Sequence, residues 1–179
     1  MAVVRKARRP AADDAADDPL DAALVDRVRA VLALGGVPHA ELQDGVQQVR
    51  LKLLESRAKG REPLRSTAAW CAVVASNIAV DWHRDRRRRE RLDERLTALR
   101  PWGTEQPGVE EARVLTLSVA QGLDALPLPQ RQVVVLRFYA DLPVAEIAEA
   151  LEIPEGTVKS RLHAAVRALR ARLHTDEVV

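Results

Sequence analysis

Apolar residues recur along this chain with the period of an α-helix, and turn-forming residues separate the helical stretches. In residues 20–34 the apolar positions share one helical face: Leu20, Leu24, Val28, Val31 and Leu32. The pair Gly35-Gly36 ends this helix, and Pro38 opens the next element. The same spacing predicts helices over 39–55, from 68 into an arginine-rich run, and over 110–125, 128–139, 143–151 and 155–173.

The second and third predicted helices each have a continuous apolar face. In the second, this face comprises Leu42, Val46, Val49, Leu53 and Leu54. In the third, it comprises Trp70, Val73, Val74, Ile78 and Trp82. Ser66 and Thr67 are candidate N-caps of this third helix, whose apolar face we expect to end where the arginines begin. We interpret Cys71, the single cysteine, as a small buried hydrophobe.

Residues 101–108 contain two prolines and two glycines, the clearest linker pattern in the chain. The predicted division is a disordered tail, a first helical domain, a flexible linker, a second helical domain and a short tail, at residues 1–19, 20–98, 99–109, 110–174 and 175–179. Ala, Leu and Arg, which favour helices, dominate the composition. The predicted fold class is therefore all-α, with two small helical domains joined by a flexible linker.

The formal net charge is only +2, so the distribution of charge is more informative than its sum. Residues 84–91 carry six arginines against two acids, and residues 159–172 carry five lysines and arginines and no acid. Residues 141–155, in contrast, carry five acids and no base. Such local asymmetry is typical of a surface that faces DNA.

The sequence contains no nucleophile-elbow motif, no phosphate-binding loop and no Cys/His spacing suited to a metal. We therefore expect a protein that is not an enzyme and that uses no cofactor, metal or small-molecule substrate. No apolar run approaches the length of a membrane span, and no signal-peptide pattern follows the N-terminal arginines. These observations predict a soluble, cytoplasmic protein with no membrane partner.

Residues 126–173 have the organisation of a helix-turn-helix. Val133, Val134, Leu136 and Phe138 are apolar enough for a buried first helix. A short helix with small residues follows Pro143, then the turn sequence EIPEG and a long amphipathic helix. The outward face of that last helix presents the candidate DNA-binding residues Glu155, Thr157, Lys159, Ser160, Arg161, His163 and Arg167. The alternative interpretation is an ordinary surface helix with a solvated basic face.

This segment resembles the C-terminal domain of extracytoplasmic-function sigma factors of the sigma-70 family. The similar stretches are Leu126-Pro127, QRQVVVLRFYADL, AEIAEAL and GTVKSRLHAAVRAL. His163-Ala164 departs from the family pattern, which often has an arginine there. The resemblance implies that the last helix recognises the −35 promoter element.

The N-terminal half resembles the same family in two further places. The stretch ELQDGVQQVRLKLLE, residues 41–55, is similar to the family segment that docks on core RNA polymerase, although Gln48 stands where an acid is usual and Arg50 where an aromatic is usual. The core-binding residues implied by this resemblance are Asp44, Gln47, Gln48 and Leu51.

The stretch AWCAVVASNIAVDWHRDRRRR, residues 69–89, is similar to the segment that captures the melted −10 strand, with Ser76 in place of an arginine. The implied strand-binding residues are Asn77, Asp81, Arg84, Arg86, Arg87 and Arg88. Arginines can neutralise the phosphates of a separated strand, while polar side chains can hydrogen-bond unstacked bases. A solvated, arginine-rich helix end is an equally good interpretation of the spacing alone. Trp82 could stack on a base, but its helical spacing favours the core.

The resemblance extends over about residues 20–95 and 110–173 and implies a sigma factor whose partners are core RNA polymerase, promoter DNA and an anti-sigma factor. A stand-alone helix-turn-helix regulator is one alternative, but it would leave the 41–55 and 77–89 segments without a role. A helical protein-binding adaptor is a second alternative. It would predict no loss of transcription when Lys159 and Arg161 become alanine.

Overall fold

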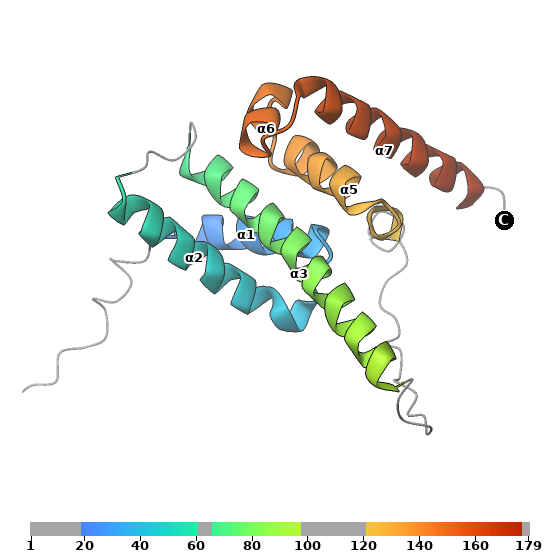
Figure 1. Cartoon of the computed structure of the whole chain (residues 1–179). Coiled ribbons are helices and arrows are strands. Elements are labelled where there is room, and N and C mark those ends of the chain that lie inside the picture. Colours follow the sequence, from blue (N-terminus) through green and yellow to red (C-terminus); the bar gives the residue numbers. More distant parts are fainter. Residues whose placement is uncertain (1–18, 61–65, 98–120, 177–179) are drawn as a thin grey trace, which may run out of the picture.

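A computed structural model describes residues 19–60, 66–97 and 121–176 (Figure 1). Every regular element within these ranges is a helix, which confirms the all-α fold class. The predicted linker at 99–109 lies outside the described residues, as does nearly all of the predicted N-terminal tail. Of the helix predicted over 110–125, the structure describes only the end, where residues 121–124 are helical.

The first helical unit consists of α1 (Ala22–Leu34), the short 3-10 helix η1 (His39–Glu41), α2 (Leu42–Ala58) and α3 (Thr67–Thr97). The three α-helices pack against one another in pairs (Figure 1). Ser66 caps α3 as predicted, since its Oγ accepts a hydrogen bond from the backbone N–H of Ala69 at 3.0 Å. Asp21 caps α1 in the same way through the N–H of Leu24, at 2.8 Å.

The second unit consists of α5 (Leu128–Val134), the π-helix η2 (Val135–Tyr139), α6 (Val144–Ala150) and α7 (Glu155–Asp176). Asp141 and Glu152 have φ values of 55° and 54°, so a left-handed residue lies on each side of the short helix α6. These two turns set α6 between η2 and α7 and produce the predicted helix-turn-helix.

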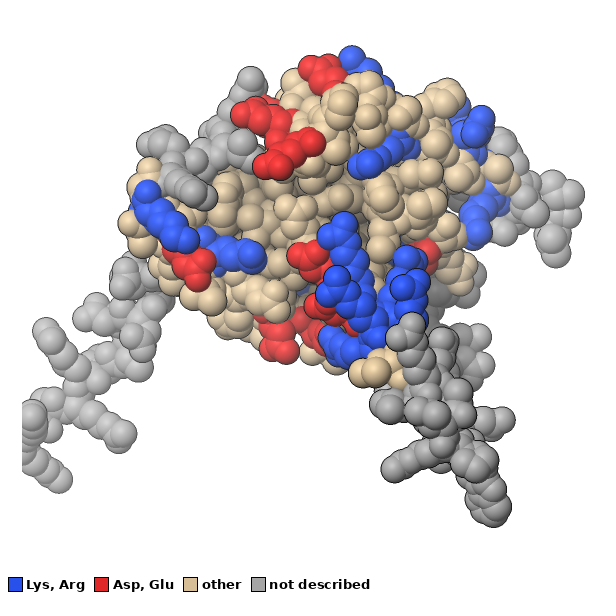
Figure 2. Space-filling model, viewed as in Figure 1, with Lys and Arg blue, Asp and Glu red and all other residues tan. Residues whose placement is uncertain are grey.

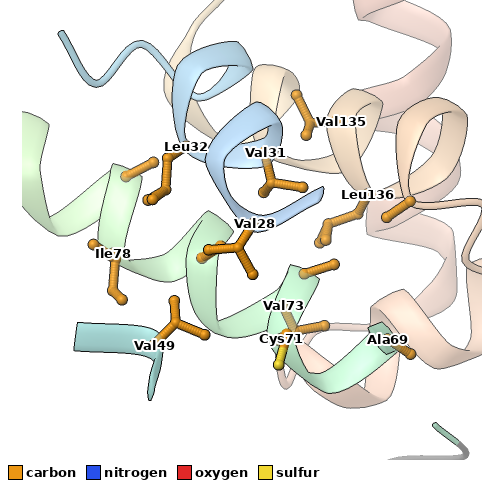
Figure 3. Packing of buried hydrophobic residues seen from close by; sticks show 14 of the residues in the cluster. Val28, Val31, Leu32, Val49, Ala69, Cys71, Val73, Ile78, Val135 and Leu136 are labelled. Atoms are coloured by element: carbon orange, nitrogen blue, oxygen red, sulfur yellow. The ribbon is translucent and has the colours of Figure 1, made fainter. Parts of the chain in front are cut away.

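Four consecutive side chains at the α5–η2 junction are buried: Val133, Val134, Val135 and Leu136. A helix that buries residues all round needs packing partners on opposite sides. Val134 packs with Ala165 of α7, while Val135 and Leu136 belong to the core cluster that contains Val31 of α1 (Figure 3). The two units therefore share one hydrophobic core, which the division into two domains does not predict.

Two predicted core residues are exposed. Phe138 is 66% exposed, because it lies in the π-helix, whose wider turn changes the direction of later side chains relative to an α-helix. Leu54 is 47% exposed, next to the buried Leu53. Helix α3 continues through the arginine run to Thr97.

Cys71 is fully buried, which confirms its interpretation as a small hydrophobe. Burial raises the pKa of its thiol to about 11, against a smaller opposing effect of Arg57, so the thiol stays protonated and unreactive. Among the helices of residues 19–60, 66–97 and 121–176, none has the length and apolarity needed to span a bilayer.

The close crossing of α1 and α3 depends on the lack of a side chain at Gly35. A Cβ placed there would lie 2.5 Å from the Cβ of Ala79, an atom that cannot rotate away. We expect Gly35→Ala to lower the free energy of unfolding by about 1–3 kcal/mol through overpacking, measured by urea denaturation. Gly156→Ala is the matched control, since a Cβ there meets nothing within 4 Å. Equal stability of the two variants would contradict the close crossing.

Candidate nucleic-acid interface

Five of the seven candidate −35 residues lie along one exposed face of α7. Because α7 buries Val158 and Ala165 against α5 and α6, its opposite side is left to solvent. We call this side the α7 face, and it comprises Glu155, Lys159, Ser160, His163 and Arg167. Lys159 Nζ lies 3.2 Å from Glu155 Oε2, so part of its charge is balanced within the face.

The other two candidates, Thr157 and Arg161, are half-buried at the flank of α7. The Thr157 carbonyl oxygen accepts a hydrogen bond from Ser160 Oγ at 3.0 Å. A helix places residues four apart on one side, so Thr157 and Arg161 form a row of their own beside the α7 face. Contact by both rows would require the first turns of α7 to lie deep in a groove, with DNA on two sides of the helix.

Four of the six candidate −10 residues form a second exposed row, on α3. This α3 stripe consists of Asn77, Asp81, Arg84 and Arg88, spaced by four, three and four residues on one side of the helix. Arg84 Nη1 lies 3.2 Å from Asp81 Oδ1, which positions the guanidinium along the stripe. Figure 2 shows the Lys and Arg side chains gathered over the C-terminal half of α3. Arg87 is exposed at the edge of the stripe.

Arg86 projects away from the α3 stripe. Its guanidinium lies 5.4 Å from the centroid of the Trp82 ring, and its Nε lies 2.7 Å from Glu90 Oε1. Trp82 itself is half-buried against the core, and its indole N–H donates to Glu41 Oε2. Trp82 thus joins α3 to the start of α2 through this hydrogen bond.

The candidate core-binding residues lie together on the exposed side of α2. This α2 stripe consists of Asp44, Gln47, Gln48 and Leu51, all exposed and spaced by three, one and three residues. Leu51 is 58% exposed, so its apolar side chain is available to a partner. Leu54 extends the apolar part of the stripe by one turn, although the sequence pattern assigned it to the core.

The donors of the polar contacts between the two helical units are residues that the sequence did not single out. Gln132 of α5 donates from Nε2 to Asn77 Oδ1 at 2.8 Å and to Ser76 Oγ at 3.2 Å. Arg131 donates from Nε to the Leu34 carbonyl oxygen, at the end of α1. Arg27 of α1 donates from Nη2 to the Ala140 carbonyl oxygen at 2.6 Å.

In the described ranges no three His, Cys, Asp or Glu side chains gather in a way that could hold a metal ion. What these ranges do contain is a helix-turn-helix with an exposed face of mixed charge, together with a long helix that carries an arginine-rich stripe. Both features define a DNA-binding protein of the helix-turn-helix class.

Comparisons with known proteins refine this class. Residues 111–169 match the family model described as Sigma-70, region 4. The sigma factor SigL of Mycobacterium tuberculosis, an extracytoplasmic-function (ECF) RNA polymerase sigma factor, is 35% identical over 142 residues, which is 75% of each chain. The ECF sigma factor RpoE of Cereibacter sphaeroides is 27% identical over 173 residues, covering 94% of this chain and 92% of its own.

A solved structure has the same fold. The sigma factor RpoE of Bartonella quintana, in complex with the anti-sigma factor NepR, superimposes with a TM-score of 0.64 at 19% identity, over 86% of this chain and 94% of that chain. The chain belongs to the ECF sigma factors of the sigma-70 family, and its function is that of a sigma factor in transcription initiation.

His83 of α3 contacts the end of α1. Its Nε2 lies 2.9 Å from the Gly35 carbonyl oxygen. Burial lowers the pKa of His83 below its ordinary value of 6.5, and the charges of Arg131, Arg87 and Arg86 lower it further, while the hydrogen bond to Gly35 opposes the shift. The folded chain therefore binds this proton less readily than the unfolded chain does.

We expect the free energy of unfolding to fall as pH decreases through 6.5 toward the lowered pKa of folded His83, because the unfolded state then binds more protons. Urea denaturation at a series of pH values measures this slope. His83→Gln should reduce the slope, while His163→Gln, on the α7 face, should retain it. An identical slope in wild type and His83→Gln would contradict this role of His83.

Proposed function

We propose that this sigma factor uses the three exposed rows as separate contact surfaces in transcription initiation. In this proposal the α2 stripe binds core RNA polymerase, the α3 stripe holds the melted −10 strand, and the α7 face recognises the −35 duplex. The observation that carries the proposal is the exposure of the α7 face on the second helix of a packed helix-turn-helix, the geometry in which a helix enters the major groove. The half-buried pair Thr157 and Arg161 is proposed to contact DNA at the edge of that groove.

The charge of the α3 stripe supports binding of a single strand. Arg84 and Arg88 are exposed, and the carboxylates beside them orient their guanidinium groups without burying them. Each phosphate that they neutralise contributes about 0.7 to the log–log salt dependence of single-strand binding. Asn77 adds an amide that can both donate and accept, as recognition of a base edge requires.

The remaining assignments follow from this division of surfaces. We infer that the chain is not an enzyme, that it acts in the cytoplasm where polymerase and DNA meet, and that residues 20–98 and 110–174 are its two functional domains. An anti-sigma factor is a further proposed partner, supported by the complex in which the Bartonella quintana protein was solved. A stand-alone regulator would give no role to the α2 stripe, which exposes Leu51 and Leu54 on one side of a helix.

Run-off transcription with purified core polymerase and a promoter library tests the proposal. The chain should produce promoter-specific transcripts that depend on its presence, whereas DNA binding without any stimulation of core would contradict the proposal.

Lys159→Ala should weaken selection at one −35 base pair by about 1–3 kcal/mol if this side chain contacts a base. A uniform loss over all promoters would assign Lys159 to a phosphate instead. Arg172→Ala, an exposed arginine near the other end of α7, is the control and should leave the transcripts unchanged.

Leu51 is the most direct test of the α2 stripe. If polymerase covers this side chain, Leu51→Ala should weaken binding to core by about tenfold, since burial of a leucine contributes about 1.5–3 kcal/mol. The change should leave the free energy of unfolding nearly unaltered, because the side chain is exposed in the free chain. Fluorescence anisotropy with labelled sigma factor measures the affinity. Lys52→Ala, at the adjacent exposed position, is the matched control, and equal affinities of the two variants would refute the assignment.

A further inference from the structure

Helix α3 packs against the core only along its first part. Ile78 and Ala79 belong to the buried cluster, and Trp82 and His83 are the next partly buried positions. Residues 84–92, which we call the arginine segment, are all exposed. Within the described ranges, Trp82 and His83 are therefore the last positions at which α3 packs on the core. Beyond them the arginine segment projects from the molecule as a continuation of the same helix (Figure 1).

Trp82 and His83 bind two different elements at the base of the arginine segment. The Trp82 indole N–H donates to Glu41 Oε2, at the end of η1 and the start of α2. The His83 Nε2 lies 2.9 Å from the Gly35 carbonyl oxygen, at the end of α1. The two rings meet edge to face with centroids 4.9 Å apart, and the Arg86 guanidinium lies 5.4 Å from the Trp82 centroid. The base of the segment is thus held against both α1 and α2.

The Glu41 carboxylate serves this contact rather than the end of its own helix. Glu41 occupies the N-cap position of α2, yet its side chain makes no capping hydrogen bond with the N–H groups that follow it. Its hydrogen bond with Trp82 is partly buried and joins two residues 41 positions apart. A hydrogen bond to a charged acceptor contributes more than one between neutral groups. Glu41 therefore stabilises the direction in which α3 leaves the core.

Small rotations at Trp82 matter most at the far end of the arginine segment. An α-helix rises about 1.5 Å per residue, so Arg88 lies about 9 Å beyond Trp82. A tilt of about 10° moves Arg88 by about 1.5 Å but moves Arg84 by only about 0.5 Å. Because binding groups have to be held within about 0.5 Å of their productive geometry, Arg88 depends strongly on how the base is fixed.

We propose that Glu41 and Trp82 are positioning residues, which hold the arginine segment in the direction needed to bind the melted strand. The inference rests on the proposed function for the role of the α3 stripe. Glu41 lies less than one helical turn before Asp44, where the α2 stripe begins. The helix assigned to core polymerase and the helix assigned to the strand are thus joined by one hydrogen bond.

Spin labels test the positioning without any DNA. Lys52→Cys on α2 and Arg91→Cys on the arginine segment place both labels at exposed positions, while the fully buried Cys71 stays unlabelled. Double electron–electron resonance should give one narrow distance distribution in the labelled chain and in its Glu41→Gln variant, whose amide oxygen still accepts from Trp82. Glu41→Ala and Trp82→Phe should each broaden the distribution by about 2 Å, since Arg91 lies about 13 Å beyond Trp82.

Strand binding by the polymerase-bound chain tests the consequence. The probe is a labelled single-stranded −10 oligonucleotide, taken from a promoter that run-off transcription selects. Glu41→Ala and Trp82→Phe should each weaken its binding by about two- to tenfold, while Glu41→Gln should bind like wild type. The double variant should lose no more affinity than either single variant, because both changes remove the same hydrogen bond.

Glu55→Ala is the matched control, because it also removes one carboxylate from α2, at an exposed position. Removal of a negative charge by itself favours binding of DNA, so the strand affinity of Glu55→Ala should be equal to that of wild type or slightly higher. A weaker affinity of Glu41→Ala is opposite in sign to this electrostatic effect and therefore reports positioning.

Three results would overturn the positioning role. The first is an unchanged distance distribution in Glu41→Ala and Trp82→Phe, with helical content intact by circular dichroism. The second is a broader distribution without any loss of strand affinity. The third is additive losses in the double variant, which would show that the two residues act separately. Failure of the proposed function is distinguishable, because Arg84→Ala and Arg88→Ala would then leave strand binding unchanged while Glu41→Ala still broadens the distance distribution.

Discussion

The arrangement of this protein depends on how the α5–η2 segment is buried. Val133 to Leu136 form a continuous apolar surface around the helix, so one packing partner cannot cover it. Helices α6 and α7 cover one side and complete the helix-turn-helix, while α1 and α3 cover the other and join it to the first unit. Without this double burial, the two proposed DNA-binding surfaces would have no fixed relation in the free chain.

The surfaces themselves follow from what remains exposed. Each of α2, α3 and α7 buries one side in the core and leaves a row of polar or charged residues on the other. The rows differ in chemistry in ways that suit different partners. The α2 stripe ends in exposed leucine side chains, the α3 stripe carries arginines, and the α7 face mixes lysine, serine and histidine. These differences are the basis for proposing a protein partner, a single strand and a duplex as their respective ligands.

The sequence predicts the helices well because they depend on local periodicity, whereas the residues of the α2 and α3 stripes were implied by the family resemblance. The helices predicted at 143–151 and 155–173 differ from α6 and α7 by at most three residues at any boundary. The contacts between the units could not be predicted in this way. Arg131 meets Leu34 across 97 positions and Gln132 meets Asn77 across 55, distances at which spacing carries no information. The run of valines before Leu136 was the one local indication of a helix buried on two sides, and the π-helix that exposes Phe138 had none.

The most direct measurement is a cryo-electron microscopy structure of the chain with core polymerase and a melted promoter. The account predicts core polymerase on the α2 stripe, the melted −10 strand on the α3 stripe, and α7 in the major groove of the −35 duplex. An open complex in which the α2 stripe lies away from core polymerase, or α7 lies outside the major groove, would contradict it.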